Sequence, residues 1–246
     1  VTIKDQELCG RFSARIVHNV DSKVKTPDWI VERLNQAGQK TISILVDISN
    51  YVMLELGRPS HIFDLDKIHF SSQNSLDVRW AKSTEEIKLL NGEKIIINPY
   101  FGVIADRNGP IALAGIMGGE RTAVSEKTQN ILIEAAFWRP DAIRGRAQKL
   151  RFLTDASHRF ERGVDFESTL NDLEIISGMI HSICGGDFGE ITDIVSVIPE
   201  IPKIYFRKSK CEKVTGMKVG ISQIKQIFDN LDFKYEPDPK HPEENL

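Results

Sequence analysis

One acidic residue lies inside an apolar run and is the first candidate for chemistry in this sequence. Glu134 interrupts the segment Asn130–Phe137, whose other members are mostly apolar. A carboxylate inside a predicted strand is costly unless something pairs with it. Two interpretations remain open. Either the strand is amphipathic, so that Glu134 faces water or pairs with Arg144 or Arg151, or Glu134 is a pocket carboxylate that accepts a hydrogen bond from a ligand hydroxyl or ammonium group.

Two histidines are the next residues able to take part in acid–base or hydrogen-bonding chemistry. His61 follows the turn Arg58-Pro59-Ser60, where a lone histidine has either a structural or a catalytic role. His158 lies in the charged segment Thr154–Gly163, and pairing with a neighbouring carboxylate is the alternative to a role in a site. The sequence contains no HExxH, GxSxG, GxxxxGK[ST] or GxGxxG motif, so it carries none of these catalytic or nucleotide-binding signatures.

A glycine-rich run, Ala112–Gly119 (ALAGIMGG), is a third candidate. It holds three glycines within five positions, but it lacks the lysine of a phosphate-binding loop. Because glycine has no Cβ, such a run lets the backbone approach a ligand or a neighbouring strand closely. We therefore expect it to line a ligand or to pack tightly.

Positive charges are concentrated further along the chain. Six of them fall within 19 residues, at Arg144, Arg146, Lys149, Arg151, Arg159 and Arg162. The default interpretation is a solvated helix face with salt bridges to Asp155, Glu161 and Asp165. Contact with an RNA backbone is the alternative.

Composition limits the class of protein. The 246 residues suffice for one large domain, or for one domain plus an extra piece, and the 41% hydrophobic content is that of an ordinary globular chain. A net charge of −3 does not indicate a general polyanion-binding surface. The three cysteines are far apart, so neither a disulfide framework nor a zinc site is expected, and a reduced cytosolic setting fits best.

Targeting and membrane signals are not evident. The N-terminal region is interrupted by charges, and no apolar run approaches the roughly 20 residues that would span a bilayer. The chain begins without methionine and ends in a polar tail, which predicts a segment cut from something longer.

Helices and short strands are predicted to position these candidates. A strand at Phe12–Val20 precedes a helix with the Thr26 hydroxyl at its N-cap and Pro27 at its first position. A second helix covers Ile42–Leu56 and stops at Gly57. From Leu76 onward, turn residues separate short predicted strands: Leu76–Ala81, Lys94–Ile97, Phe101–Asp106 and Ile111–Ala114. The segment Thr84–Leu90, which lies between the first two of these strands, is predicted to be at best a short helix.

The second half continues this mixed pattern. Asn130–Phe137 is predicted as a strand and Pro140–Lys149 as a helix, and a long amphipathic helix starts at Asp165 or Glu167 and ends at Gly185-Gly186. The predicted elements after it are strands Glu190–Ile198 and Lys203–Phe206 and helices Ser209–Thr215 and Ile221–Leu231. The fold class expected is mixed α/β, with a largely antiparallel sheet curled toward a barrel and helices on its outside.

Five segments of the chain, taken in order, resemble the beta subunits of bacterial phenylalanine–tRNA ligases. They are VDISNYVMLELGRPSHIFDLDKI (46–68), LNGEKIIIN (90–98), GPIALAGIMGG (109–119), NILIEAAFW (130–138) and LRFLTDASHRFERGVD (150–165). The resemblance extends from about residue 9 to residue 200. It implies an editing domain at 1–200, followed at 201–246 by the truncated start of a small winged-helix-like domain.

The resemblance also implies a function and a set of site residues. In that family this region hydrolyses tyrosine wrongly esterified to phenylalanine tRNA. By position, Glu134 matches the acid that recognises the tyrosine phenol, and His61 and Asn50 match residues at the ester end, to which we assign catalysis. The other matching positions, assigned to substrate binding, are Ser49, where threonine is commoner in the family, and Gly115, Gly118, Thr154 and Ala156.

Partners and cofactors follow from the same resemblance. The parent complex pairs this subunit with an alpha subunit, binds phenylalanine tRNA, and uses ATP and magnesium in a synthetic site that lies on the alpha subunit. For this chain alone we expect no cofactor, no metal, no membrane contact and a cytoplasmic location. The alternative function is a non-catalytic structural or tRNA-docking domain, and a stand-alone RNA-binding protein is disfavoured by the net charge of −3.

Overall fold

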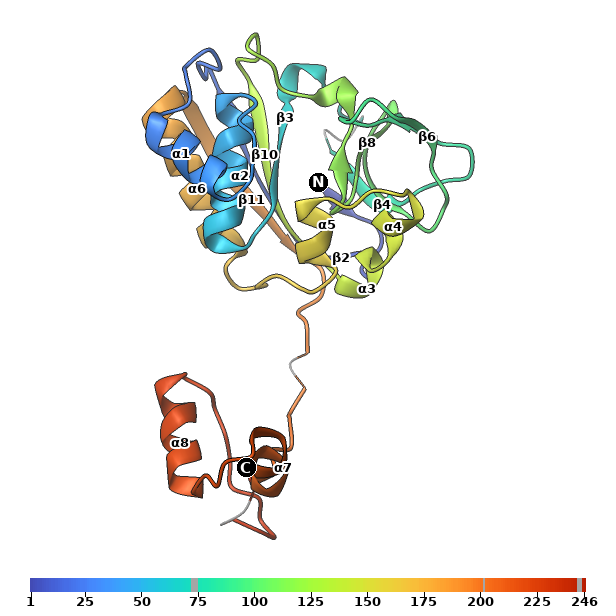
Figure 1. The fold of residues 1–246 in the computed structure, drawn as a ribbon. Helices are drawn as coiled ribbons and strands as arrows, with labels where there is room; N and C mark the ends of the chain where they lie inside the picture. Colours follow the sequence, from blue (N-terminus) through green and yellow to red (C-terminus); the bar gives the residue numbers. More distant parts are fainter. Residues whose placement is uncertain (72–74, 201, 243–244) are drawn as a thin grey trace. The chain divides into compact units, whose positions relative to one another are not determined.

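The chain consists of two compact units. The computed structural model describes residues 1–71, 75–200, 202–242 and 245–246. Unit 1 is Val1–Pro199 and unit 2 is Glu200–Leu246. Unit 1 contains the sheets and most of the helices, whereas α7 (Lys208–Thr215) and α8 (Ile221–Asn230) belong to unit 2 (Figure 1).

A four-stranded antiparallel sheet forms the centre of unit 1. Its strands follow the order β11-β2-β10-β3, with bounds Asp187–Val195, Cys9–His18, Ile131–Trp138 and Ser60–Asp64. All eight residues of β10 are buried, because the strand is central in the sheet and both of its faces are covered. Burial on both faces is why its sequence is an almost continuous apolar run.

Successive residues of β10 point into two different cores. Ile131, Ile133 and Ala135 belong to one cluster, which also contains apolar residues of three helices on that face of the sheet (Figure 1). These helices are α1 (Asp28–Gln36), α2 (Ile44–Leu56) and α6 (Thr169–Cys184). Leu132, Ala136 and Trp138 belong to the other cluster. Because side chains alternate along a strand, Glu134 faces this second core.

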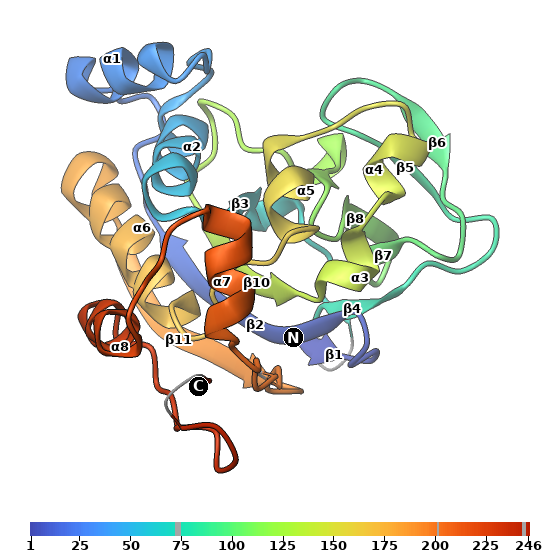
Figure 2. The same ribbon diagram turned by 60° about the horizontal axis from the view of Figure 1, so that its bottom comes forward.

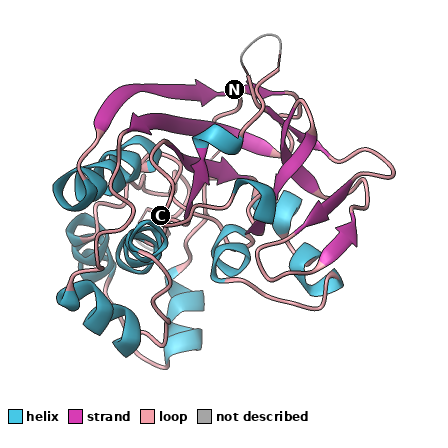
Figure 3. Ribbon diagram, turned by 90° about the horizontal axis from the view of Figure 1, so that it is seen from above, coloured by secondary structure: helices cyan, strands magenta, loops and turns pink. Residues whose placement is uncertain are grey.

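A second sheet packs on the face of β10 that carries Glu134. Its strands follow the order β1-β4-β7-β8-β9, with bounds Thr2–Ile3, Asp77–Trp80, Gly102–Asp106, Gly109–Leu113 and Met117–Gly118. The hairpin β5–β6, Glu86–Lys88 and Lys94–Ile96, lies beside it. In Figure 3 the strands of unit 1, drawn in magenta, cross one another at several angles.

Short helices complete this side of unit 1. Two turns of 3-10 helix cover Leu65–Lys67 and Glu120–Thr122. After β10, the chain forms α3 (Pro140–Ile143), α4 (Arg146–Lys149) and α5 (Asp155–Phe160). The expected fold class is confirmed: the structure is mixed α/β, and among the described strands only β1 and β4 pair in parallel. In neither of the two larger sheets do the first and last of the described strands pair with each other, so the sheets do not close into a barrel.

Several predicted elements differ in the structure. Thr26 does not cap α1, because Pro27 takes that position and the Thr26 hydroxyl instead donates to Asp47 at 2.6 Å. The segment Thr84–Leu90 contains strand β5 rather than a helix, since the turn at Asn91-Gly92 folds it onto β6. The predicted helix Pro140–Lys149 is split at Gly145, where φ is +70°.

Two further differences concern strands. Strand β3 was not predicted, because Arg58-Pro59-Ser60 has the composition of a turn. The segment Lys203–Phe206 is not a strand, and its backbone contributes only a pair of hydrogen bonds between Phe206 and Leu246. No helix among the described residues is long and apolar enough to cross a membrane.

Candidate functional site

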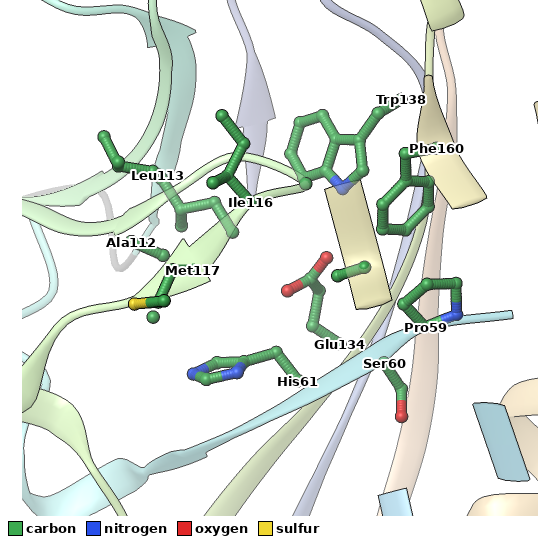
Figure 4. Close-up of a pocket in the computed structure, with 14 residues that line it drawn as sticks. Pro59, Ser60, His61, Ala112, Leu113, Ile116, Met117, Glu134, Trp138 and Phe160 are labelled. Carbon is green, nitrogen blue, oxygen red and sulfur yellow. The ribbon is translucent and has the colours of Figure 1, made fainter. Parts of the chain in front are cut away.

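A small cavity of about 60 Å³ lies between the two sheets, under α5 (Figure 4). Strands β3 and β10 supply His61 and Glu134 from one side, and the glycine-rich segment after β8 supplies the opposite wall. The complete lining is Pro59, Ser60, His61, Ile104, Ala112, Leu113, Gly115, Ile116, Met117, Gly118, Glu134, Trp138, Ala156 and Phe160. Most of these side chains are apolar, so the few polar groups define what the cavity can bind.

Glu134 and His61 are direct cross-strand neighbours. The antiparallel register pairs Glu134 with His61 across β10 and β3. Residues paired in this way present their side chains on the same face, with their Cβ atoms about 5 Å apart. Figure 4 shows both side chains entering the cavity from the same side. The strand register, rather than proximity in sequence, therefore brings these two polar groups together.

Glu134 is a buried carboxyl group without a polar partner. Its exposed fraction is 6%. No described residue forms a hydrogen bond or ion pair with its carboxyl oxygens, and Arg144 pairs with Asp141 instead. Burial in this apolar site raises the pKa of Glu134 to about 8. The carboxyl group is therefore mainly protonated near neutral pH, and the interpretation of Glu134 as a surface residue is excluded.

His61 is the second polar group without a partner. His61 lines the cavity, but its Nε2 is buried and has no hydrogen-bond partner among the described residues. Burial lowers the pKa of His61 to about 4, so the imidazole is neutral near pH 7. The ring is held edge-on against Phe63, with centroids 4.4 Å apart. A neutral imidazole with a free nitrogen can donate to or accept from a ligand or a water molecule, depending on its tautomer.

The glycine-rich segment approaches His61 so closely that no side chain fits between them. A Cβ on Gly118 would overlap the His61 ring, at 2.5 Å from Nε2. Gly115 has φ of +65°, a conformation that favours glycine, and a Cβ there would lie 2.9 Å from Trp138 and Ile143. Of the two expectations for this run, tight packing is thus found at these two glycines.

Buried polar contacts fix the strand that carries His61. The guanidinium of Arg58 donates to Asp172 of α6 at 2.7 Å and to the Ala136 carbonyl of β10 at 2.8 Å. Both members of this ion pair are almost fully buried. Ser168 also donates to Asp172, at 2.7 Å. Since Ala136 is two residues beyond Glu134, Arg58 ties the entry to β3 to the strand that carries the carboxyl group.

The predicted site residues divide into two groups. His61, Gly115, Gly118, Glu134 and Ala156 line one cavity. The other three, Ser49, Asn50 and Thr154, are not among its lining residues.

Two of these three residues, Ser49 and Thr154, contact lining residues without lining the cavity themselves. The Ser49 hydroxyl is 2.9 Å from the Ser60 hydroxyl, which links α2 to the start of β3. Asn50 is half-buried on α2. Thr154 caps α5, accepting from the Ser157 amide at 3.0 Å and donating to the Ile116 carbonyl at 2.8 Å. Thr154 therefore joins two walls of the cavity without lining it.

Aromatic and flexible lining residues were missed in the sequence. Trp138 and Phe160 close one end of the cavity, and Met117 lies at the other (Figure 4). An apolar residue in a buried strand or helix has no sequence signal that separates a cavity wall from ordinary core. The position of Trp138 four residues after Glu134 indicates the same face of β10, and this was the one usable signal.

The arrangement is suited to recognition more than to covalent catalysis. Ser60 is the one hydroxyl-bearing residue of the lining, and its oxygen is engaged with Ser49. No group of three or more histidine, cysteine or acidic residues in the described parts of the chain can hold a metal ion. The cavity presents one carboxyl group to whatever enters, with the His61 ring in its wall and apolar side chains around both.

Comparison with known proteins identifies the class to which this fold and site belong. The sequence profile of the B3/4 domain matches residues 8–185, and the chain belongs to that family.

The particular relatives are beta subunits of phenylalanine–tRNA ligase. That of Burkholderia mallei is 51% identical over 97% of this chain, and that of Cupriavidus pinatubonensis is 48% identical over 96%. The chain spans 29% and 28% of the length of these two curated relatives. A solved N-terminal fragment of the phenylalanyl-tRNA synthetase beta-subunit from Pyrococcus horikoshii is 15% identical, with a TM-score of 0.48, over 99% of this chain and 66% of that one.

Proposed function

We propose that this chain is the editing module of a phenylalanine–tRNA ligase beta subunit, and that it hydrolyses the ester of tyrosine wrongly joined to phenylalanine tRNA. The high identity to such beta subunits over nearly the whole chain supports the assignment to the subunit. The observation that supports the editing role is Glu134, a buried carboxyl group with no partner in the described structure, which faces an apolar cavity.

Physical limits on discrimination explain why such a second site is needed. A synthetic pocket shaped for phenylalanine rejects a molecule that merely adds a hydroxyl by only about a hundredfold. A second site can reverse the test by requiring that hydroxyl. In the proposed complex the tyrosine phenol donates to Glu134, whereas the ring of phenylalanine leaves the carboxyl group unpaired, so that correctly charged tRNA is spared.

The protonation state of Glu134 shapes this recognition. With its pKa raised to about 8, the carboxyl group is mainly neutral at pH 7, and its carbonyl oxygen is the acceptor for the phenol. A hydrogen bond to the ionised form is stronger, about 1.5–3 kcal/mol against about 1 kcal/mol for a neutral pair. Tyrosine binding therefore favours the ionised form and lowers the pKa of Glu134, and it is expected to tighten as pH rises toward 8.

The size of the cavity implies that the substrate widens it. At about 60 Å³, the cavity is smaller than the 300–1,000 Å³ that is usual for ligand pockets. Met117 is the unbranched, flexible side chain of the lining, so its rotation is the change that widens the cavity at the lowest energetic cost. Gly118 and Ala156 contribute little side-chain volume, which keeps the remaining space for an aromatic ring.

Hydrolysis of the ester requires an oriented water molecule and stabilisation of the oxyanion. In the proposal the His61 imidazole orients the water. Its Nε2 has no partner among the described residues but is enclosed against Gly118, so the glycine-rich wall has to shift when the water binds there. Backbone amides of the glycine-rich segment, including Gly115 and Gly118, stabilise the developing charge. Asn50 and Ser49 act at the ester end, outside the cavity lining, and Thr154 holds the wall that contains Ala156.

The proposed parent enzyme is a complex with an alpha subunit that carries the synthetic site and uses ATP and magnesium to ligate phenylalanine to its tRNA. The described residues offer no cluster that fits a metal ion, and in the proposal magnesium belongs to the synthetic site of the alpha subunit. The partners are then the alpha subunit, phenylalanine tRNA and the tyrosine moiety, and the proposed location is the cytoplasm.

Selective loss of tyrosine recognition tests the proposal. In the assembled α/β enzyme, Glu134→Ala is expected to reduce deacylation of tyrosyl-tRNA strongly, while the slow deacylation of phenylalanyl-tRNA stays the same or rises. Glu134→Gln, which retains a carbonyl acceptor, is the matched control and should keep part of the activity. An equal loss on both esters would place Glu134 in the chemical step rather than in recognition.

His61→Ala tests the catalytic half of the proposal. If His61 orients the water, kcat for tyrosyl-tRNA deacylation falls while binding of tyrosine is retained. Intact deacylation in this variant would remove His61 from that role. A wild-type assembly that does not deacylate tyrosyl-tRNA at all would contradict the editing function and leave the alternative, a non-catalytic structural or tRNA-docking domain.

A further inference from the structure

The surface that covers α3, α4, α5 and their connecting loops, residues 139–162, is here named the basic face. It contains seven arginines and lysines but three acidic residues, whereas the whole chain carries a net charge of −3. The positive charge is therefore local, and the rest of the chain is clearly acidic. Figure 2 shows α3, α4 and α5 grouped together on one side of unit 1.

Some of these cations have structural contacts. Arg146 lies over the Trp80 ring at 5.2 Å and donates to the Tyr100 carbonyl at 2.7 Å. Lys149 lies over the Tyr100 ring at 4.3 Å. Arg159 pairs with Asp155 one helical turn earlier. These residues hold the short helices on the sheet, and they are not assigned to a partner.

Three exposed arginines are available for a partner. Arg144 pairs with Asp141. Arg162 pairs with Glu161 and also donates to the His158 carbonyl at 2.8 Å; the two arginine side chains are 64% and 59% exposed. Exposed pairs of this kind contribute little stability, so the guanidinium groups can exchange them for another anion. Arg151 is exposed, and its side chain has no hydrogen bond or ion pair with any residue that the structure describes. Together they present guanidinium forks, the groups that bind phosphate oxygens in pairs.

The basic face is continuous with the wall of the cavity. Ala156 and Phe160 line the cavity from α5, and Trp138 lines it immediately before the first residue of the face. Arg151 and Arg162 lie just before and just after α5. The polymer attached to an aminoacyl ester in this cavity has to leave it past the elements that build its walls. A chain of phosphates that leaves past α5 meets the arginines.

We infer that the basic face docks the sugar–phosphate backbone of the single-stranded RNA end that carries the ester, through Arg144, Arg151 and Arg162. This inference rests on the proposed function, and it adds the surface that holds the nucleic acid. Phosphate contacts of this type fix orientation without reading sequence. They also make binding depend on salt, because each neutralised phosphate releases counterions.

The test replaces the three arginines together in the assembled α/β enzyme, as R144Q/R151Q/R162Q. The matched control, K25Q/K82Q/R107Q, removes the same charge from exposed cations outside the basic face. For tyrosyl-tRNA deacylation, we expect KM of the first variant to rise at least tenfold with kcat unchanged. Each phosphate contact to a single strand contributes roughly 0.7 to the slope of log KM against log salt concentration, so the loss of three contacts should lower this slope by about 2. The control should match the wild type.

A second measurement separates this inference from the proposed function. Equilibrium binding of a short single-stranded oligoribonucleotide to the same proteins needs no deacylation, so it reports on docking even if the enzyme does not edit. A loss of affinity and of salt slope limited to R144Q/R151Q/R162Q supports the inference. Equal binding and equal KM in the two triple variants would overturn it, as would loss of α/β assembly in the first variant, which would assign the face to a protein partner.

Discussion

Glu134 and His61 combine two opposite electrostatic responses in one cavity. Burial raises the pKa of the carboxyl group to about 8 and lowers that of the imidazole to about 4. Near neutral pH both groups are therefore mainly uncharged, although they are direct neighbours across β10 and β3. The low-dielectric surroundings favour the neutral form of each group. The cavity therefore stays uncharged although a carboxyl group and an imidazole lie in its lining.

The raised pKa of Glu134 makes the stability of unit 1 depend on pH. The folded protein keeps a proton on Glu134 up to about pH 8, whereas the unfolded chain loses it near the ordinary value of 4.5. Between these values the folded state binds more protons, so the free energy of unfolding falls as pH rises, by at most about 1.4 kcal/mol per pH unit. Glu134→Gln cannot ionise and should remove this contribution, so its stability relative to wild type rises from pH 5 to pH 9.

Denaturation followed by tryptophan fluorescence provides the measurement, because Trp29, Trp80 and Trp138 all lie in unit 1. The other titrating groups are common to both proteins and cancel in the difference. His61 acts with the opposite sign: its lowered pKa removes stability as pH falls from about 6.5 toward 4. Parallel stability profiles for wild type and Glu134→Gln above pH 5 would show that the carboxyl group is not buried as described.

At the scale of elements, the sequence predicted correctly those helices and strands whose conformation depends on neighbouring residues in the chain. The helix α2 and its end at Gly57, with φ of +78°, follow from the apolar spacing and the left-handed cap. Strand β10 was predicted from its apolar run, but a strand buried on both faces shows no alternation, so the face of Glu134 was undetermined. That face is set by β2 and β3, which are remote in sequence.

Contacts between segments remote in sequence account for the wrong prediction at Thr84–Leu90 and for the missed strand β3. The segment Thr84–Leu90 contains good helix formers, yet Ile87 is buried between two exposed residues on a strand, because the hairpin turn and the neighbouring sheet decide its conformation. Strand β3 has no strong signal of its own, because its ends are defined by pairing with β10. The site depends on this pairing. Sequence therefore identified five lining residues but could not assemble the cavity.

Thr154 is expected to couple helix α5 to the glycine-rich segment. Its hydroxyl caps the helix and also donates to the buried Ile116 carbonyl. Thr154→Val preserves the shape but removes both bonds, so we expect a loss of about 2 kcal/mol in the free energy of unfolding and a higher KM for tyrosyl-tRNA. Thr154→Ser retains the hydroxyl and should lose less than half as much. A loss in Thr154→Ser as large as that in Thr154→Val, measured by urea denaturation, would show that the methyl group contributes as much as the two hydrogen bonds and would contradict the assigned role of the hydroxyl.

The Arg58–Asp172 ion pair is expected to hold β3 in register. Arg58→Met leaves Asp172 buried without its cation and should cost about 3–5 kcal/mol. The double variant R58M/D172L removes both charges and should recover most of this loss, since apolar residues can replace a buried pair. The free energy of unfolding of the double variant should then be close to that of the wild type. It should stay slightly lower, because the Ala136 carbonyl loses the hydrogen bond that Arg58 donates. A double variant no more stable than R58M would contradict the assigned role of the pair.

At the scale of the whole molecule, the two units differ in how much apolar surface they bury. Unit 1 has two hydrophobic clusters, one on each face of β10, and the candidate site lies in the cluster shared with the second sheet. In the described part of unit 2, Ile224 and Leu246 are the buried apolar residues, while Val214, Met217 and Phe233 are exposed. A small unit with so little core stabilises its helices weakly.

Hydrogen exchange of the 246-residue chain is therefore expected to separate the units. Amides of α7 and α8 should exchange through local opening, orders of magnitude faster than those of β2 and β10, whose central strands open only with unit 1 as a whole. The surface helix α1 is the internal control, since it tests whether helices as such exchange quickly. It packs Ile30 and Leu34 into a core and should be well protected. Protection of α7 and α8 equal to that of β10 would mean that unit 2 is stabilised far beyond what the two apolar side chains buried in its described part supply.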